Sequence, residues 1–301
     1  MDFKKAASIG LEIDQEYISA VELESEGKEV ILKKSGKVEL PPLLVTPSLR
    51  EENISDVEKF KAAIKNLFDN TGISGKQMTV AIPDASVKIT FLEFEDIPKE
   101  RGKIIELIKW NLKKALPFPS DEAVVDYQII DTPSDKSRLY RLVIALMRKS
   151  VLEQYENLLS GCRLIHNVII PSSLASYNLY HGCFLETPIC ALLTVSQKRI
   201  TVMIAKQGKP CFHRNKEIDG ERDALREISA SLNYYQDIDG EMPARLYLVD
   251  NGYEPMDLKA NMEAYFGGID IKPIGLSDVI KGVNGSMNIF SGAAGVALKE
   301  L

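Results

Sequence analysis

An internal repeat is the feature of this 301-residue sequence that most restricts its fold. The segment LEIDQEYISAVE at 11–22 aligns without gaps with LTVSQKRITVMI at 193–204, at a constant offset of 182 residues. Each copy has an apolar run, a polar turn and a second apolar run, which is the pattern of a β-hairpin. The match predicts that the chain contains two halves of the same topology.

The sequence after each hairpin also continues in a similar way. A third strand is predicted at 29–34 and at 209–214, and a helix with a periodic apolar face follows at 55–70 and at 221–236. The first of these helices opens with Ser55 and Glu58, the spacing of a capping box, and Gly72 is placed to end it. The repeat therefore extends beyond the hairpin to a longer strand and helix pattern.

The stretch between the repeats has its own pattern. Residues 78–170 alternate as strand, strand, helix, strand, strand, helix and strand, and a second capping box at Ser150 and Glu153 is predicted to start the last helix. We therefore predict an α/β chain with a duplicated fold and an inserted α+β subdomain in its first half. The predicted boundaries are the following: 1–77 plus 166–188 for the first half, 78–165 for the inserted subdomain and 189–301 for the second half.

Two further helices carry information about packing. Trp110 lies beside Lys109 and Lys113 on a helix predicted to run from Pro98 to Ala115, where it either anchors a partner or belongs to the core. The closing segment SGAAGVALKEL predicts a helix of small residues that packs closely against its neighbours.

Composition and charge exclude several classes of protein. Acidic residues outnumber basic residues 43 to 37, which gives a net charge of −6 and argues against general binding of nucleic acid. The four cysteines and three histidines match no zinc spacing, so no metal site is predicted, and free thiols suggest a reducing compartment. No signal peptide and no membrane span is expected.

The two hairpin turns are predicted to face each other across a cleft. Turn amides of this kind form concave sites for phosphate groups. A third turn, Asp250-Asn251-Gly252, follows the strand at 245–249, where a base and a ribose could dock. Candidate nucleotide-binding residues in this cleft are Asp14, Gln15, Thr194, Ser196 and Gly252.

Several segments together resemble the actin-like ATPase superfamily and, within it, the PilM family of type IV pilus assembly proteins. They are SIGLEIDQEYISAVELE, IPKERGKIIELIKWNLKKALPFPSDEAVVDYQII, RLYLVDNGY and GAAGVAL. The cell-division protein FtsA and the cytoplasmic domain of GspL are similar neighbours. The resemblance implies two ribonuclease-H-like halves with a small subdomain inserted in the first, and it covers essentially the whole chain.

The sequence departs from the nucleotide-binding members of this superfamily in each turn. Where those members carry an Asp-x-Gly signature, the first turn reads Glu12-Ile13-Asp14 and the second reads Thr194-Val195-Ser196. Carboxylates at Asp14 and Glu16 are expected to repel a polyphosphate. We therefore expect no ATP turnover, no catalytic residue and no required cofactor, with weak binding of ATP and Mg²⁺ as the alternative.

Two pairs of residues near the turns allow more than one interpretation. Glu12 and Asp14 could form an acid/base pair, although solvated turn carboxylates are the favoured interpretation. Lys198 and Arg199 could bind phosphate, although an exposed hairpin tip is favoured.

The resemblance also implies a function. It implies a cytoplasmic scaffold of type IV pilus assembly that binds the N-terminal cytoplasmic peptide of a PilN-like bitopic membrane protein, together with other inner-membrane components of the pilus. The peptide would lie in a groove lined by residues 78–148 and 7–24. The chain would then be peripheral to the inner face of the inner membrane, without direct membrane insertion. An active ATPase or phosphotransferase, and a GspL-like component of type II secretion, remain as alternatives.

Overall fold

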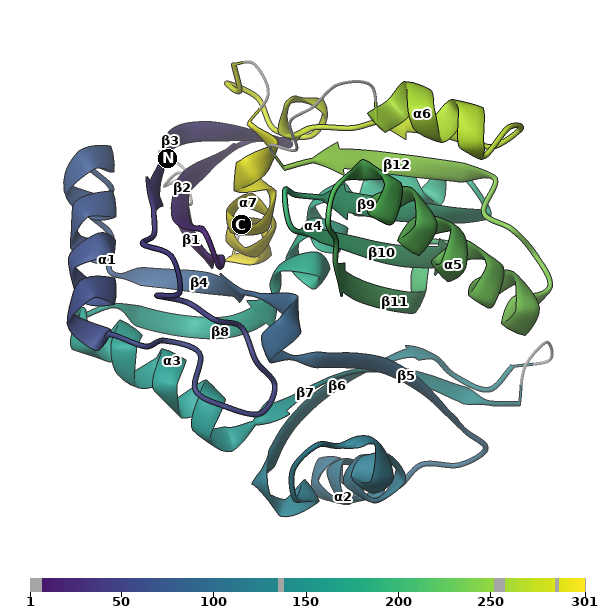
Figure 1. Cartoon of the computed structure of the whole chain (residues 1–301). Coiled ribbons are helices and arrows are strands. Elements are labelled where there is room, and N and C mark those ends of the chain that lie inside the picture. The colour runs from purple at the N-terminus through teal and green to yellow at the C-terminus, as the bar shows by residue number, and fades with distance from the viewer. Residues whose placement is uncertain (1–6, 135–137, 252–257, 285–286, 301) are drawn as a thin grey trace.

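Two five-stranded sheets with the same strand order form the body of the protein (Figure 1). The computed structural model describes residues 7–134, 138–251, 258–284 and 287–300. The first sheet has the order β3-β2-β1-β4-β8 and the second has the order β11-β10-β9-β12-β13. In each sheet the first three strands form an antiparallel meander, and the remaining strands pair in parallel.

The elements of the two halves follow each other in a matching sequence. Those of the first half are β1 (Ala7–Ile13), β2 (Tyr17–Glu26), β3 (Glu29–Glu39), α1 (Val57–Thr71), β4 (Gln77–Ile82), α3 (Lys149–Gly161), β8 (Ile165–Pro171) and α4 (Ser172–Tyr180). Those of the second half are β9 (Ile189–Val195), β10 (Arg199–Lys206), β11 (Lys209–Glu217), α5 (Glu221–Asp239), β12 (Arg245–Asp250), α6 (Leu258–Tyr265), β13 (Asp270–Pro273) and α7 (Ser291–Ala297).

The predicted repeat is confirmed at the level of single residues. Strand β9 begins and ends 182 residues after β1, and β10 begins 182 residues after β2. Ile13 pairs with Ile18 in the first hairpin, and Val195 pairs with Ile200 in the second. The constant offset of the alignment therefore also holds for the strand pairing of the two hairpins.

The inserted subdomain is a three-stranded antiparallel sheet covered by one helix. Its elements are β5 (Lys88–Phe94), α2 (Arg101–Leu112), β6 (Ala123–Asp131) and β7 (Tyr140–Arg148), and its strand order is β5-β7-β6. Ile104, Ile108 and Leu112 of α2 pack on this sheet and form a separate core with it. Trp110 points away from that core and is 75% exposed, so of the two interpretations left open for it, the core position is wrong.

The predicted boundaries of the insertion, 78–165, are too wide. Strand β4 lies inside the first sheet, between β1 and β8, and α3 packs on the core of the first half. The three-stranded sheet extends only from 88 to 148. The sequence alone did not show this, because an apolar run indicates a strand but not the sheet that the strand joins.

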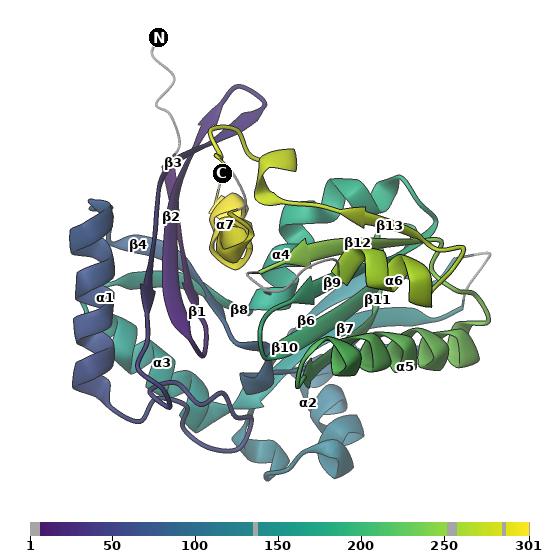
Figure 2. The same cartoon turned by 45° about the horizontal axis from the view of Figure 1, so that its top comes forward.

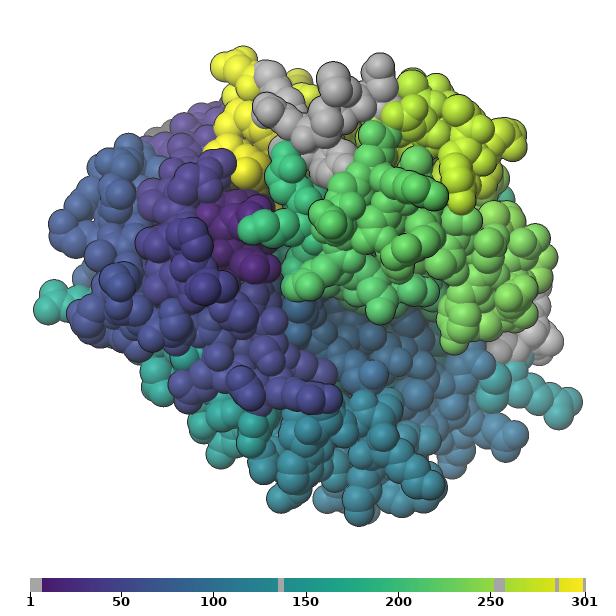
Figure 3. All heavy atoms as spheres, in the orientation of Figure 1, coloured from purple at the N-terminus to yellow at the C-terminus, as the bar shows by residue number. Residues whose placement is uncertain are grey.

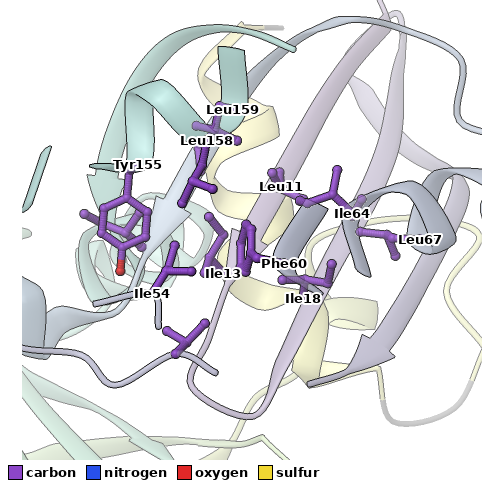
Figure 4. Packing of buried hydrophobic residues seen from close by; sticks show 14 of the residues in the cluster. Leu11, Ile13, Ile18, Ile54, Phe60, Ile64, Leu67, Tyr155, Leu158 and Leu159 are labelled. Atoms are coloured by element: carbon purple, nitrogen blue, oxygen red, sulfur yellow. The ribbon is translucent and has the colours of Figure 1, made fainter. Parts of the chain in front are cut away.

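The core of the first half lies between its sheet and the helices α1 and α3. Leu11, Ile13 and Ile18 of the sheet face Phe60 and Ile64 of α1, as Figure 4 shows. Tyr155, Leu158 and Leu159 of α3 complete this cluster (Figure 4). Burial of these large side chains supplies the hydrophobic stabilisation of the half.

Both predicted capping boxes are wrong, although the helices exist. The N-cap of α1 is Asp56, whose carboxylate accepts a hydrogen bond of 3.0 Å from the Lys59 amide. Ser55 instead donates its hydroxyl to the Leu43 carbonyl, at 2.9 Å. Helix α3 begins at Lys149, directly after β7, without a side-chain cap. The predicted end of α1 at Gly72, which has a φ of +64°, is confirmed.

Helices α4 and α7 join the two halves. Figures 1 and 2 both show α7 between the strands β1 and β2 on one side and the helix α4 on the other. The prediction that the closing segment forms a closely packed helix is confirmed. An ideal Cβ on Gly10 would lie 1.8 Å from the Ala293 carbonyl oxygen, and one on Gly295 would lie 2.0 Å from the Ala175 carbonyl oxygen. These contacts exclude any side chain, so glycine is required where the halves meet.

Replacement of Gly295 by alanine is expected to destabilise the protein by about 2 kcal/mol, because the added methyl group overlaps the backbone of α4. Urea unfolding followed by circular dichroism measures the change. The matched control is Gly102→Ala in α2, where an added Cβ would meet no atom within 4 Å. That variant is expected to be as stable as the parent or slightly more stable. Equal stability of both variants would contradict the assignment of the α4–α7 contact.

Candidate functional site

The tips of the two repeated hairpins face a narrow cavity between the halves, which we call the interdomain cleft. The two turns are closed in the same way. The Asp14 amide donates to the Tyr17 carbonyl and the Ser196 amide donates to the Arg199 carbonyl, each at 2.9 Å. The structure therefore repeats the turn geometry as well as the strand pairing.

The structure brings four of the predicted nucleotide-site residues together. Asp14, Gln15, Thr194 and Ser196 all line the interdomain cleft. Gly252 lies outside the described residues. Within the described part of the chain, no cluster of three or more His, Cys, Asp or Glu side chains is arranged to hold a metal ion.

Glu12 is buried under the small-residue helix α7, and the interpretation of it as a solvated turn carboxylate is wrong. Glu12 is 3% exposed, and an ideal Cβ on Gly292 would lie 2.1 Å from Oε1 of Glu12. The other oxygen, Oε2, has no hydrogen-bond partner among the described residues. Burial, followed by the charge of Asp14, raises the pKa of Glu12 from its ordinary value of 4.5 to about 8.

Asp84 connects three parts of the chain and was missed by the sequence analysis. Its Oδ1 accepts from the Ser173 hydroxyl at 2.7 Å and from the Ser173 amide at 3.2 Å, and its Oδ2 accepts from the Thr201 hydroxyl at 3.4 Å. Ser173 Oγ also lies 3.0 Å from Nε2 of His213. Asp84 follows β4 and Ser173 follows β8, so the rule that sites lie at the carboxyl ends of parallel strands could have found both.

This polar cluster is a link between the halves rather than a nucleophilic triad. In a triad the carboxylate accepts a hydrogen bond from the histidine. Here the Asp84 carboxylate instead accepts one from the Ser173 hydroxyl. Burial lowers the pKa of His213, which favours the neutral imidazole. Asp84 and Ser173 belong to the first half, whereas Thr201 and His213 belong to the second, so these bonds hold the cleft closed.

The basic residues of the second turn are paired with protein carboxylates. Lys198 lies 2.7 Å from Glu16 across the cleft, and Arg199 lies 2.7 Å from Glu217. Arg199 also donates to the Asn215 side chain at 2.8 Å. The open space in the interdomain cleft is about 60 Å³, whereas ligand pockets have volumes of about 300–1,000 Å³. A wider depression of about 460 Å³ adjoins the cleft and shares Asp14, Gln15 and Ser196 of its lining.

A second cavity, which we call the insertion groove, has a volume of about 870 Å³. It lies between the inserted sheet, the β8–α4 segment and the β10–β11 turn of the second half, and its lining includes Asp126, Ile129, Ile169, Leu174, Tyr177 and Gly208. The prediction that residues 7–24 line a groove beside the insertion is wrong for this cavity. Strands β1 and β2 lie behind β4 and β8 in the sheet order.

Two strand edges border the insertion groove. Strand β6 pairs with β7 on one side and is the last strand of the inserted sheet, and β8 is the last strand of the first sheet, within the described residues. Such edges present backbone amides and carbonyls to an extended chain. The groove is closed at its second-half wall by a hydrogen bond from Tyr177 to the Gly208 carbonyl and by an ion pair between Lys209 and Asp131.

Solved structures share this architecture. A Bacteroides thetaiotaomicron protein with an actin-like ATPase fold and unknown function matches with a TM-score of 0.57 at 13% identity, over 97% of each chain. The cytoplasmic domain of EpsL, from the type II secretion system of Vibrio cholerae, matches with a TM-score of 0.53 at 11% identity, over 93% of this chain and 97% of that chain. The duplicated sheets and the facing hairpin tips therefore define an actin-like fold, as predicted.

A more similar structure and a family match narrow this class. A chain of the PilM-PilN type IV pilus biogenesis complex matches with a TM-score of 0.83 at 17% identity, over 97% of this chain and 98% of that chain. The sequence model of the family described as type IV pilus assembly protein PilM matches residues 10–237. The chain belongs to this family. No curated protein matches the sequence, and no helix in the described residues is long and apolar enough to cross a membrane.

The raised pKa of Glu12 predicts a pH-dependent stability. Between about pH 4.5 and pH 8 the folded state binds this proton and the unfolded state does not, so the free energy of unfolding falls as the pH rises through that window. We expect the parent protein to lose on the order of 3 kcal/mol relative to Glu12→Gln across this range. Urea unfolding at a series of pH values measures it.

The control for this measurement is Glu51→Gln, at an exposed loop position. This variant is expected to follow the pH profile of the parent. If Glu12→Gln also follows that profile, the Glu12 carboxyl does not carry the pH dependence.

Proposed function

We propose that this chain acts in type IV pilus assembly by binding the N-terminal cytoplasmic peptide of a PilN-like membrane protein in the insertion groove. The observation that carries the proposal is the groove itself, which has about 870 Å³ of space between two strand edges. Membership of the PilM family and the likeness to a chain of the PilM-PilN complex support this partner.

The chemistry of the groove suits an extended peptide. The edges of β6 and β8 offer backbone hydrogen bonds, and Ile129, Ile169 and Leu174 offer apolar contacts for alternate side chains. Asp126 lines the groove and is paired with Arg101, and Lys209 of the lining is paired with Asp131. A bound peptide would hold the chain against the cytoplasmic face of the inner membrane, where other components of the pilus could contact it.

We further propose that the interdomain cleft does not turn over ATP. The cleft has about 60 Å³ of open space, and its Lys198 is already paired with Glu16. Glu12, which faces α7, is buried beneath Gly292 and has its pKa raised to about 8, so the Glu12 carboxyl does not suit a magnesium ion. The residues present do not fit a metal-bound polyphosphate. The role that remains is that of a scaffold.

Binding of the synthetic N-terminal peptide of the cognate PilN-like protein is expected in calorimetry. Ile129→Glu is expected to weaken that binding at least about tenfold, because it places a charge on the β6 edge of the groove. Ile165→Glu is the matched control, since Ile165 lies on β8, is 60% exposed and does not line the groove. If Ile129→Glu and Ile165→Glu bind the peptide with equal affinity, the peptide does not bind in the insertion groove.

ATP with Mg²⁺ is expected to leave the melting temperature unchanged. A site with a Kd a hundredfold below the ATP concentration would stabilise the native state by about 2.7 kcal/mol, a shift that thermal unfolding detects easily. A clear rise in melting temperature with ATP, absent with AMP, would revive the interpretation of the chain as an ATPase or phosphotransferase.

A further inference from the structure

The outer face of α2 combines one exposed tryptophan with lysines that have no ion pair. Trp110 is 75% exposed, and Lys113 and Lys114 follow it by three and four residues, in the short 3-10 turn Lys113–Ala115 that continues α2. Within the described residues, Lys109, Lys113 and Lys114 form no ion pair, unlike Arg101 and Lys103 of the same helix. We call Trp110 and these three lysines the basic face of α2.

The charge of this segment is opposite to that of the chain. Six basic and two acidic residues lie between 99 and 114, whereas the whole chain has a net charge of −6. The apolar residues Ile104, Ile108 and Leu112 face the inserted sheet, so the charge and the indole both face outward. Such a local excess of positive charge attracts a surface of negative charge.

The basic face also lies at one end of the molecule. Figure 1 shows α2 on the outer side of the inserted sheet, away from α1 and α6. In the space-filling view the insertion lies below the two halves, which rest against each other (Figure 3). A flat surface could therefore approach α2 without first meeting the duplicated body of the protein.

We propose that the basic face of α2 binds the surface of a bilayer that contains anionic lipids. Lysine ammonium groups attract phosphate head groups without a fixed geometry, and tryptophan is favoured at the boundary between head groups and hydrocarbon. The contact is peripheral, since α2 has 12 residues and its inner face is buried in the subdomain core. It acts as a second, weak membrane contact beside the peptide partner.

The position of the insertion groove agrees with this orientation. Arg101, the first residue of α2, lines the groove, and Trp110 lies nine residues further along the helix, about 14 Å at 1.5 Å per residue. A membrane protein whose cytoplasmic peptide occupies the groove would bring this end of the molecule to the bilayer. In this respect the inference rests on the proposed function, and a tethered chain needs only a weak lipid contact.

Trp110 is the only tryptophan of the chain, so its fluorescence reports directly on this surface. The experiment titrates the protein, without any peptide, with vesicles of phosphatidylcholine containing about 30% phosphatidylglycerol. We expect a blue shift of the emission and co-sedimentation with these vesicles. Neither effect is expected with pure phosphatidylcholine, and both should disappear at about 0.5 M salt.

A charge-matched pair of variants tests the assignment of the residues. Lys109→Glu/Lys113→Glu/Lys114→Glu is expected to lower the vesicle affinity by on the order of 100-fold. The control, Lys28→Glu/Lys76→Glu/Lys216→Glu, changes the net charge equally at exposed lysines outside α2 and is expected to keep most of the affinity. Circular dichroism and thermal unfolding show whether both variants are folded.

Three results would overturn the inference: no binding to anionic vesicles at low salt, no change in Trp110 emission on binding, or equal losses in both triple variants. Calorimetry with the PilN-like peptide, in the absence of vesicles, keeps the two proposals distinguishable. The α2 variant is expected to bind the peptide normally, and Ile129→Glu is expected to bind vesicles normally. If α2 instead binds an acidic protein and not a bilayer, the titration with anionic vesicles would show no binding.

Discussion

The contact between α7 and β1 fixes the geometry of both candidate sites. At Gly10, Gly292 and Gly295, backbone or carboxylate atoms occupy the space that a side chain would need. Helix α7 of the second half can therefore lie directly on the first sheet, while α4 packs beside it and on the core of the second half. This exchange of helices sets the distance between the two hairpin tips, and through it the width of the interdomain cleft.

The same packing explains why the cleft is polar and yet nearly full. Glu12 lies under Gly292, and Asp84 joins Ser173 to Thr201 across the halves. A wider space, of about 870 Å³, lies between the inserted sheet and β8, where strand edges lie next to a cavity. The chain thus has the actin-like architecture together with a wide cavity at the insertion.

The repeated hairpins, the fold class and the close-packing C-terminal helix could be predicted from the sequence. Each depends on a local pattern: an alignment at a constant offset, apolar periodicity, or a run of glycine and alanine. The boundaries of the insertion could not be predicted, because the sequence does not show which sheet the strand at 77–82 joins. The capping box at Ser55 was wrong for a similar reason. The Ser55 hydroxyl donates to the Leu43 carbonyl, a contact that residue spacing does not show.

The sequence by itself determined that the chain has two similar halves and that Asp14, Gln15, Thr194 and Ser196 lie at or next to the facing hairpin turns, because these features follow from strand period and turn position. Only the tertiary structure decided the state of the cleft and the position of the groove. The burial of Glu12, the link through Asp84 and the exposure of Trp110 each depend on elements that lie far apart in the chain. Burial and pairing are properties of such neighbours, and for that reason one strand or one helix taken alone does not determine them.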